Sequence, residues 1–108
     1  MPGSFTIGRL RNDDVLTPAV VLPLLNQRGD EVAWLAYKHI PYRSLDRIQV
    51  VGIWVDRSLQ RRGIGRRLVS ELLNSRQLGP VLVDSKAYTS AGEGFWPKMI
   101  VEGYAEPI

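Results

Sequence analysis

The order of elements predicted between residues 48 and 83 constrains this chain more than any other feature. Residues 48–55 are β-branched and almost wholly apolar, which predicts a strand buried on both faces of a sheet. After a polar loop, apolar residues recur at helical spacing over 63–76, and Gly79-Pro80 ends that helix. Residues 81–83 then form a second apolar strand. A strand, a helix and a strand of this length predict a right-handed crossover between parallel strands.

The residues before this unit predict an antiparallel hairpin. Residues 20–25 and 32–38 are apolar runs on either side of Arg28-Gly29-Asp30, a sequence typical of a turn. Pro23 places the first run at a sheet edge or a bulge, because proline cannot donate to a ladder of hydrogen bonds. The second run is expected to end where residues 41–44 break the strand pattern.

Shorter elements are expected toward the two ends of the chain. A first strand is predicted within residues 4–11, a short helix at 95–99 and a last strand at 101–104. Pro97 fits this helix if the helix begins near Gly94, because the first amides of a helix have no helical acceptor.

These elements define an α/β fold with a mixed β-sheet, antiparallel in its N-terminal strands and parallel in a central pair joined by a helix. The chain has 108 residues, of which 44% are apolar, so one domain spanning 1–108 is expected. The absence of cysteine excludes a disulfide framework and fits a cytoplasmic protein. No apolar run approaches the length of a membrane span, and the first residues lack the pattern of a signal peptide.

Basic residues crowd around the start of the predicted long helix. The net charge is only +3, but eleven of the fourteen basic residues are arginine. Cations are disfavoured at a helix N-terminus, whereas the planar guanidinium group suits phosphate. The crowding therefore predicts a multiply charged anion bound there, with a solvated basic face as the alternative. The arginines concerned are Arg57, Arg61, Arg62, Arg66 and Arg67.

The loop that opens this helix has the features of a phosphate cradle. Gly63 and Gly65 lack a Cβ atom, which is expected to let a ligand approach the main chain. The first amides of the helix add unpaired donors at the positive end of its dipole. A Walker loop is excluded because Arg66 follows Gly65, and a dinucleotide fingerprint would need glycine in place of Leu68.

The segment Gln60-Arg61-Arg62-Gly63-Ile64-Gly65 resembles the acetyl-CoA loop of the GNAT superfamily of N-acetyltransferases, Q/R-x-x-G-x-G/A. Residues 53–56 are similar to the end of the central strand of that family, and residues 95–99 to its second motif, F-Y-x-K-L-G-F. The resemblance covers residues 48–104. It implies a GNAT-like acyl-CoA N-acyltransferase fold, acetyl-CoA as co-substrate without a metal, and transfer of an acetyl group to an amine of a small molecule or a protein.

The resemblance also implies the site residues. Backbone amides from about Arg61 to Arg66 would hold the diphosphate, and the central strand would pair with the pantetheine arm. The residues expected to contact acetyl-CoA are Ile53, Trp54, Val55, Gln60, Arg61, Arg62, Gly63, Ile64, Gly65, Arg66, Thr89 and Trp96. The acids and bases, chosen by their chemistry and predicted position, are Asp84, Tyr88 and Tyr104.

The sequence departs from the family pattern in ways that bear on catalysis. Trp96 stands where many members carry the tyrosine that protonates the leaving thiolate, and an indole cannot act as that acid. Ile100 and Val101 replace the G-F pair of the second motif. The two helices that usually follow the first strand, and that wall the acceptor site, have no counterpart in the predicted elements. The acceptor site is therefore expected to be open or to be completed by a second subunit in a homodimer.

Two other hypotheses stay open beside acetyl transfer. The departures from the pattern favour a GNAT-fold protein that binds CoA or a protein partner without turnover. The arginines alone would suit a nucleic-acid-binding module. The low net charge, and the lack of aromatic residues among the arginines, count against that module.

Overall fold

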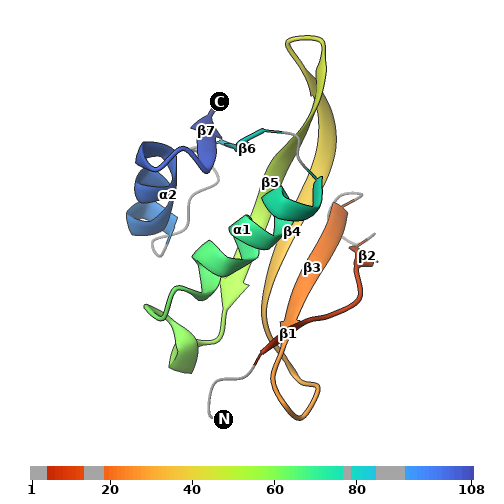
Figure 1. Cartoon of the computed structure of the whole chain (residues 1–108), viewed down its shortest axis with the longest axis vertical. Coiled ribbons are helices and arrows are strands. Elements are labelled where there is room, and N and C mark those ends of the chain that lie inside the picture. Colours follow the sequence, from red (N-terminus) through yellow and green to blue (C-terminus); the bar gives the residue numbers. More distant parts are fainter. Residues whose placement is uncertain (1–4, 14–18, 77–78, 85–91) are drawn as a thin grey trace.

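The computed structural model describes residues 5–13, 19–76, 79–84 and 92–108. A mixed sheet of seven strands runs through the molecule in the order β1-β3-β4-β5-β6-β7, and β2 pairs with β3 (Figure 1). The strands are β1 (Thr6–Ile7), β2 (Arg11–Asp13), β3 (Ala19–Leu25), β4 (Glu31–Tyr42), β5 (Leu45–Val55), β6 (Val81–Val83) and β7 (Ala105–Pro107). The helices are the 3₁₀ turn η1 (Arg57–Leu59), α1 (Ile64–Arg76) and α2 (Gly92–Val101).

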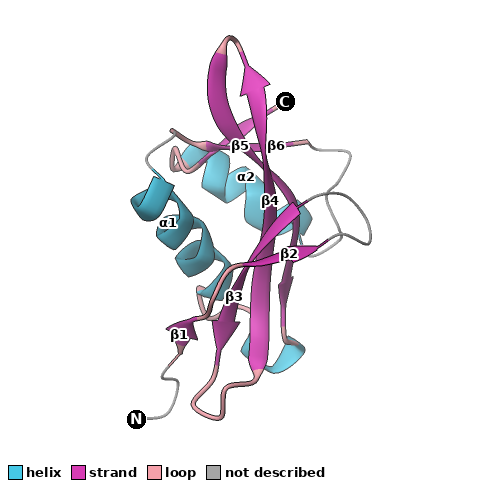
Figure 2. Ribbon diagram, turned by 90° about the vertical axis from the view of Figure 1, so that its right-hand side faces the viewer, coloured by secondary structure: helices cyan, strands magenta, loops and turns pink. Residues whose placement is uncertain are grey.

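Strands β1 to β5 form the antiparallel part of the sheet, and the β4–β5 hairpin projects beyond the rest of the molecule (Figures 1 and 2). The prediction that residues 41–44 break the strand was wrong, since Pro41 pairs with Asp46 and the turn is only Arg43-Ser44. Both turn residues have positive φ, 53° and 66°, as a type I′ hairpin turn requires. Pairs alternate between bonded and non-bonded along such a ladder, and Pro41 is one pair away from the bonded pair that closes the turn, so its missing N–H costs little.

The β4–β5 ladder contains a β-bulge that bears on the site. Tyr37 pairs with Val50 and Ala36 pairs with Gly52, so Val51 is an extra residue on β5. The predicted parallel pairing of β5 with β6 is confirmed, with Gln49 registered against Leu82. Because β6 is short, β5 continues past it toward Val55. A bulge bends its strand and leaves one residue out of the ladder, so the two parallel strands diverge from this point.

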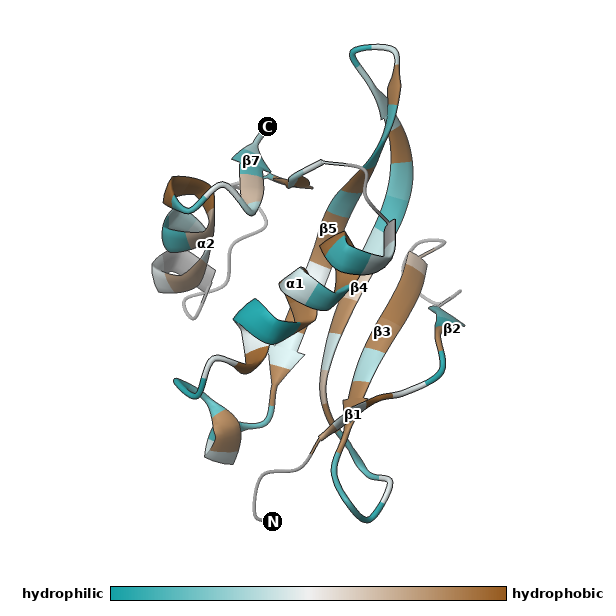
Figure 3. Ribbon diagram, in the orientation of Figure 1, coloured by the Kyte–Doolittle hydropathy of each residue, from teal (hydrophilic) through white to brown (hydrophobic). Residues whose placement is uncertain are grey.

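The core lies between the sheet and the two helices. α1 packs on β3, β4 and β5, where Leu68, Val69 and Leu72 are buried as their helical spacing predicts. Trp96 and Met99 of α2 belong to the same core cluster. Hydrophobic residues follow the strands, whereas hydrophilic ones occupy the β3–β4 turn and the loop before α1 (Figure 3). None of the helices in the described part of the chain is long and apolar enough to cross a membrane.

The predictions for the C-terminal residues need correction. α2 covers residues 92–101 rather than 95–99, so Pro97 lies inside the helix, and the last strand is 105–107 rather than 101–104. Residues 102–104 instead end α2 in a Schellman motif. Gly103 has φ 84°, its N–H donates to the carbonyl of Ile100, and the N–H of Tyr104 donates to that of Met99. The apolar residues that suggested a strand belong to this helix end.

The predicted first strand, 4–11, is two short strands in the structure. β1 pairs with the end of β3 and β2 with its beginning, and both lie along the same edge. Gly8 lies between them, and its N–H donates to the carbonyl of Pro23 at 2.9 Å. A Cβ atom there would approach the Pro23 ring to 3.0 Å, so the close contact favours glycine.

Candidate functional site

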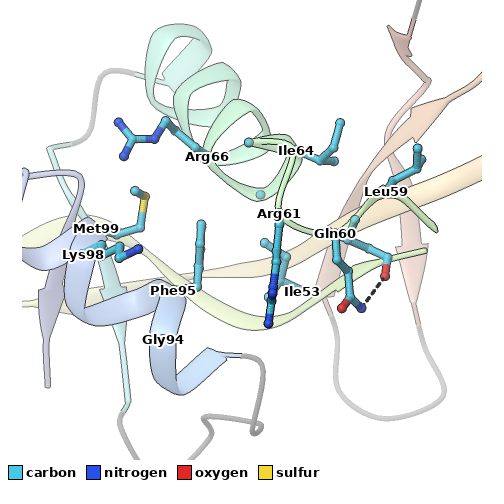
Figure 4. Close-up of a pocket in the computed structure, with 13 residues that line it drawn as sticks. Ile53, Leu59, Gln60, Arg61, Ile64, Arg66, Gly94, Phe95, Lys98 and Met99 are labelled. Carbon is cyan, nitrogen blue, oxygen red and sulfur yellow. Dashed lines mark hydrogen bonds between the residues drawn. The ribbon is translucent and has the colours of Figure 1, made fainter. Parts of the chain in front are cut away.

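A pocket of about 530 Å³ lies between the end of β5, the loop that leads into α1, and α2 (Figure 4). Ile53 and Val55 of β5 form its floor, and Gln60, Arg61 and Gly63 belong to the loop. Phe95, Lys98 and Met99 of α2 close the opposite side, and Ile64, Gly65 and Arg66 of α1 complete it. The pocket therefore lies along the part of β5 beyond its registered pairing with β6.

Hydrogen bonds fix the first part of the loop. The Asp56 carboxylate caps η1 by accepting from both the N–H and the hydroxyl of Ser58, at 3.0 Å each. These bonds favour the ionised form, so they hold the pKa of Asp56 below its ordinary value. The Gln60 side-chain amide then donates to the carbonyl of Val55 at 3.2 Å, which ties the loop back to the end of β5.

The second part of the loop has an unusual backbone. Arg61 has φ 65° and Gly63 has φ 77°, both in the left-handed region that favours glycine. The hydrogen bonds of α1 begin with the Arg67 N–H, which donates to the Gly63 carbonyl at 3.0 Å. The preceding amides of Ile64, Gly65 and Arg66 therefore have no acceptor within the helix. Alternating backbone conformations that gather amides at one end of a helix form an anion-binding concavity.

The two loop glycines serve different purposes. A Cβ atom on Gly63 would meet nothing within 4 Å, so the space beside this backbone is open to a ligand. A Cβ atom on Gly65 would come within 3.0 Å of the Phe95 ring, so Gly65 makes room for a side chain of α2. Gly65 also lines the pocket, so its contact with Phe95 adds a packing purpose to the predicted approach of a ligand.

The arginines do not form a single cluster. Arg61 and Arg66 line the pocket, and the Arg66 guanidinium pairs with Glu102 at 2.7 Å. Arg67 turns away and donates to the carbonyl of Phe5 at 3.0 Å. Arg57 and Arg62 are exposed and do not line the pocket. Their separation weakens the hypothesis of a continuous basic surface for nucleic acid.

Comparison with known proteins identifies the family. Residues 6–78 match the model of the Acetyltransferase (GNAT) family, from β1 to the end of α1. The chain is a member of the GNAT family. None of the curated proteins compared with the sequence matches it significantly.

Solved structures show that this GNAT chain has the fold of larger acetyltransferases. It is similar to ribosomal-protein-alanine N-acetyltransferase from Brucella melitensis biovar Abortus, with a TM-score of 0.63 and 19% identity over 75% of this chain and 61% of that one. It is also similar to an aminoglycoside acetyltransferase from an uncultured soil metagenomic sample, with a TM-score of 0.60 and 22% identity over 83% of this chain and 61% of that one. A third similar structure is a mutant of the toxin AtaT bound to acetyl-CoA and to the C-terminus of the antitoxin AtaR. Its TM-score is 0.55, with 14% identity over 75% of this chain and 57% of that one. The chain thus spans about three fifths of each neighbour.

Two predicted tryptophan contacts are not pocket residues. Trp54 is 41% exposed and pairs across the sheet with Trp34, so its side chain points away from the Ile53 and Val55 side chains on the pocket floor. Trp96 is 4% exposed in the core, and its neighbour Phe95 lines the pocket instead. The Phe95 and Trp96 rings pack edge to face, with their centroids 4.8 Å apart. In this GNAT chain the position of the usual acid tyrosine is therefore a packed core residue.

Of the catalytic candidates, Asp84 and Tyr104 are described, and they lie at opposite ends of β6. Asp84 directly follows β6, on the side where the parallel strands diverge. The carbonyl of Tyr104 accepts from the N–H of Val81, so Tyr104 lies at the opposite end of β6. Its role as an acid stays a prediction. Tyr88 and Thr89 lie outside the described residues.

Sequence reasoning missed the α2 wall of the pocket. Phe95, Lys98 and Met99 recur at spacings of three and four, which places them near one another on a helix. The helix was predicted from this segment, but nothing in the sequence indicated which face points at α1. Among the described residues no group of His, Cys, Asp or Glu side chains could hold a metal ion.

Proposed function

We propose that this GNAT protein binds acetyl-CoA in the pocket and transfers the acetyl group to an amine of a small molecule or a protein. The observation that carries the proposal is the open concavity of amides at the start of α1, where Gly63 leaves room for a ligand. Among the described residues that line the pocket beside it, three have cationic side chains and none has a carboxylate, so the pocket suits a diphosphate.

The residues present fit the parts of this co-substrate. The amides of Ile64, Gly65 and Arg66, with the Arg61 side chain, would hold the diphosphate. The part of β5 beyond its pairing with β6 can accept an extended arm carrying amides, in the manner of an added strand. Phe95 and Met99 supply the apolar wall against which the methylene groups of such an arm would pack.

The divergence of β5 and β6 is the proposed place of transfer. There the amine would attack the thioester carbonyl, so that an N–C bond forms, the C–S bond breaks, the amine loses a proton and the sulfur leaves as a thiolate. The backbone at the Val51 bulge, outside the regular ladder, is the proposed donor to the developing oxyanion. Asp84, at the end of β6, is the proposed acceptor of the proton from the amine.

Ligand-induced stabilisation tests the binding step. Acetyl-CoA at about one hundred times its dissociation constant should raise the melting temperature by on the order of 10 °C in a chain of this size. Gly63→Glu should abolish the shift, because it places bulk and negative charge against the amides. Gly29→Glu is the matched control, since Gly29 also has positive φ and open space beside it, but lies in the β3–β4 turn. Absence of any shift at millimolar acetyl-CoA contradicts the proposal.

Buried Trp96 favours one second candidate, a GNAT-fold protein that binds CoA without turnover. Release of free CoA thiol in the presence of a panel of polyamines, aminoglycosides, amino acids and peptides distinguishes the two. Thiol release that depends on the amine supports transfer. A thermal shift without thiol release on any amine supports binding alone.

A further inference from the structure

The three cations of the pocket lie on two sides of it. Figure 4 shows Arg61 beside Gln60 on the loop side, and Arg66 and Lys98 on the side of the two helices, with Phe95 between the two groups. The proximity of Arg66 to Lys98 also follows from the contacts. Arg66 pairs with Glu102 at 2.7 Å, and the N–H of Glu102 donates to the carbonyl of Lys98, one helical turn earlier.

We propose that Arg66 and Lys98 form a second anion subsite, which takes the 3′-phosphate of CoA and lets the protein distinguish CoA from dephospho-CoA. The inference rests on the proposed function, because it assigns a part of the same ligand to a part of the same pocket. We refer to these two residues as the Arg66–Lys98 subsite.

On the side of the pocket formed by the two helices, cationic side chains outnumber carboxylates among the described residues by one. Glu102 neutralises Arg66 only, and within the described part of the chain Lys98 makes no ion pair. A phosphate monoester carries a charge of about −1.5 to −2 at neutral pH, which matches the two cations once Glu102 is displaced or shared. Both residues also line the pocket, so a ligand bound there lies within reach of their side chains.

The kinds of donor explain which phosphate binds where. The start of α1 offers backbone amides in a fixed concavity, which suits a diphosphate that must lie close to the main chain. The Arg66–Lys98 subsite offers two long side chains, which can close on a terminal phosphate with several free oxygens. A ligand with both groups therefore occupies both sides of the pocket, and the terminal phosphate is the one the helices contact.

Calorimetric titration with CoA and with dephospho-CoA tests the subsite. We expect the wild-type protein to bind CoA about tenfold more tightly or better, as charge-assisted hydrogen bonds at a partly exposed site allow. Lys98→Ala should weaken the binding of CoA several-fold and leave that of dephospho-CoA nearly unchanged. Arg66→Ala should act in the same direction, with circular dichroism checking that the loss of the Glu102 contact has not unfolded it.

Arg67→Ala is the matched control, because it removes the same charge from the next residue of α1, whose side chain points to Phe5. It should leave the ratio of the two dissociation constants unchanged. Equal affinity of the wild-type protein for both ligands, or a ratio unaffected by Lys98→Ala, overturns the subsite while the proposed function stands. If neither ligand binds, both the subsite and the proposed function fail.

Discussion

Gly65 of α1 has no Cβ atom, and this allows α2 to pack closely against it. Its position lets the Phe95 ring pass within 3.0 Å of where a Cβ would lie, and that ring is also a wall of the pocket. Gly63, two residues earlier, has open space beside it and is needed for its left-handed backbone. One short loop therefore carries both a packing requirement and a conformational one.

This difference predicts that shortening the Phe95 side chain restores stability to a Gly65 variant but not to a Gly63 variant. Gly65→Ala should lower the free energy of unfolding by about 1–3 kcal/mol, because the methyl group displaces Phe95 from a packed position. Adding Phe95→Leu should recover part of that loss. Gly63→Ala should cost about 1 kcal/mol through backbone strain, and Phe95→Leu should not relieve it. Urea unfolding of the four variants measures this coupling, and equal effects of Phe95→Leu in both backgrounds contradict it.

The repeat of Gly-x-Gly could be recognised from sequence, but the purposes of its two glycines could not. The loop, the long helix and the basic residues around it are local features, so their residue pattern predicts them. Whether a glycine faces a ligand or a neighbouring ring depends on how α2 packs on α1, and that contact joins residues thirty positions apart. For the same reason the tryptophan in the family motif was expected beside the ligand, whereas Phe95 occupies the pocket.

At the scale of elements, Arg47 joins β5 to the strands that follow α1. Its guanidinium donates to the carbonyl of Pro80 at 2.8 Å and pairs with Glu106 of β7 at 2.9 Å. The side chain is only 12% exposed, and its Nε atom is buried with no partner among the described atoms. Since β5 and β6 are registered at Gln49 and Leu82 alone, this one side chain strengthens a short junction.

Removal of Arg47 should therefore be costly. Arg47→Ala leaves the Pro80 carbonyl and a half-buried Glu106 without their donor, so we expect a loss of about 2–3 kcal/mol in the free energy of unfolding. Arg11→Ala, which removes an exposed pair with Glu31 at 2.7 Å, should cost about 1 kcal/mol or less. Chemical denaturation compares the two. Similar losses for both variants would show that Arg47 acts as an ordinary surface residue.

The first antiparallel hairpin and the central crossover were predicted because their apolar runs and turns are local sequence patterns. The errors fall where a local pattern was ambiguous. Pro41 suggested the end of a strand, but its place in the ladder requires no donor from it. Val101 and Tyr104 suggested a strand, but Gly103 ends a helix there.

At the scale of the whole molecule, the sheet consists of two unequal parts. β3, β4 and β5 are paired over most of their lengths, whereas β6, α2 and β7 join them through short pairings, the shared core and Arg47. The pocket has walls from both parts, β5 on one side and α2 on the other. A ligand in the pocket would therefore hold the two parts together.

Amide hydrogen exchange should reveal this division. Amides of β6, α2 and β7 should exchange through smaller openings than those of β3 and β4, because fewer contacts must be broken. Saturating acetyl-CoA should slow exchange in α2 and in the end of β5 more than in β3. Mass spectrometry of peptides from each segment measures the exchange. Uniform exchange across both parts, or uniform slowing by the ligand, contradicts the division.

The short outermost strands of the sheet limit how copies of the chain can associate. One border is shared by β1 and β2, of two and three residues, and the other is β7, which has three residues and ends in proline. Backbones so short are poor templates for the growth of a longer sheet, so pairing with another copy at these two borders is disfavoured. Within the described residues, the longer unpaired edge is the end of β5 past Gln49, which is the edge that the proposed ligand would cover.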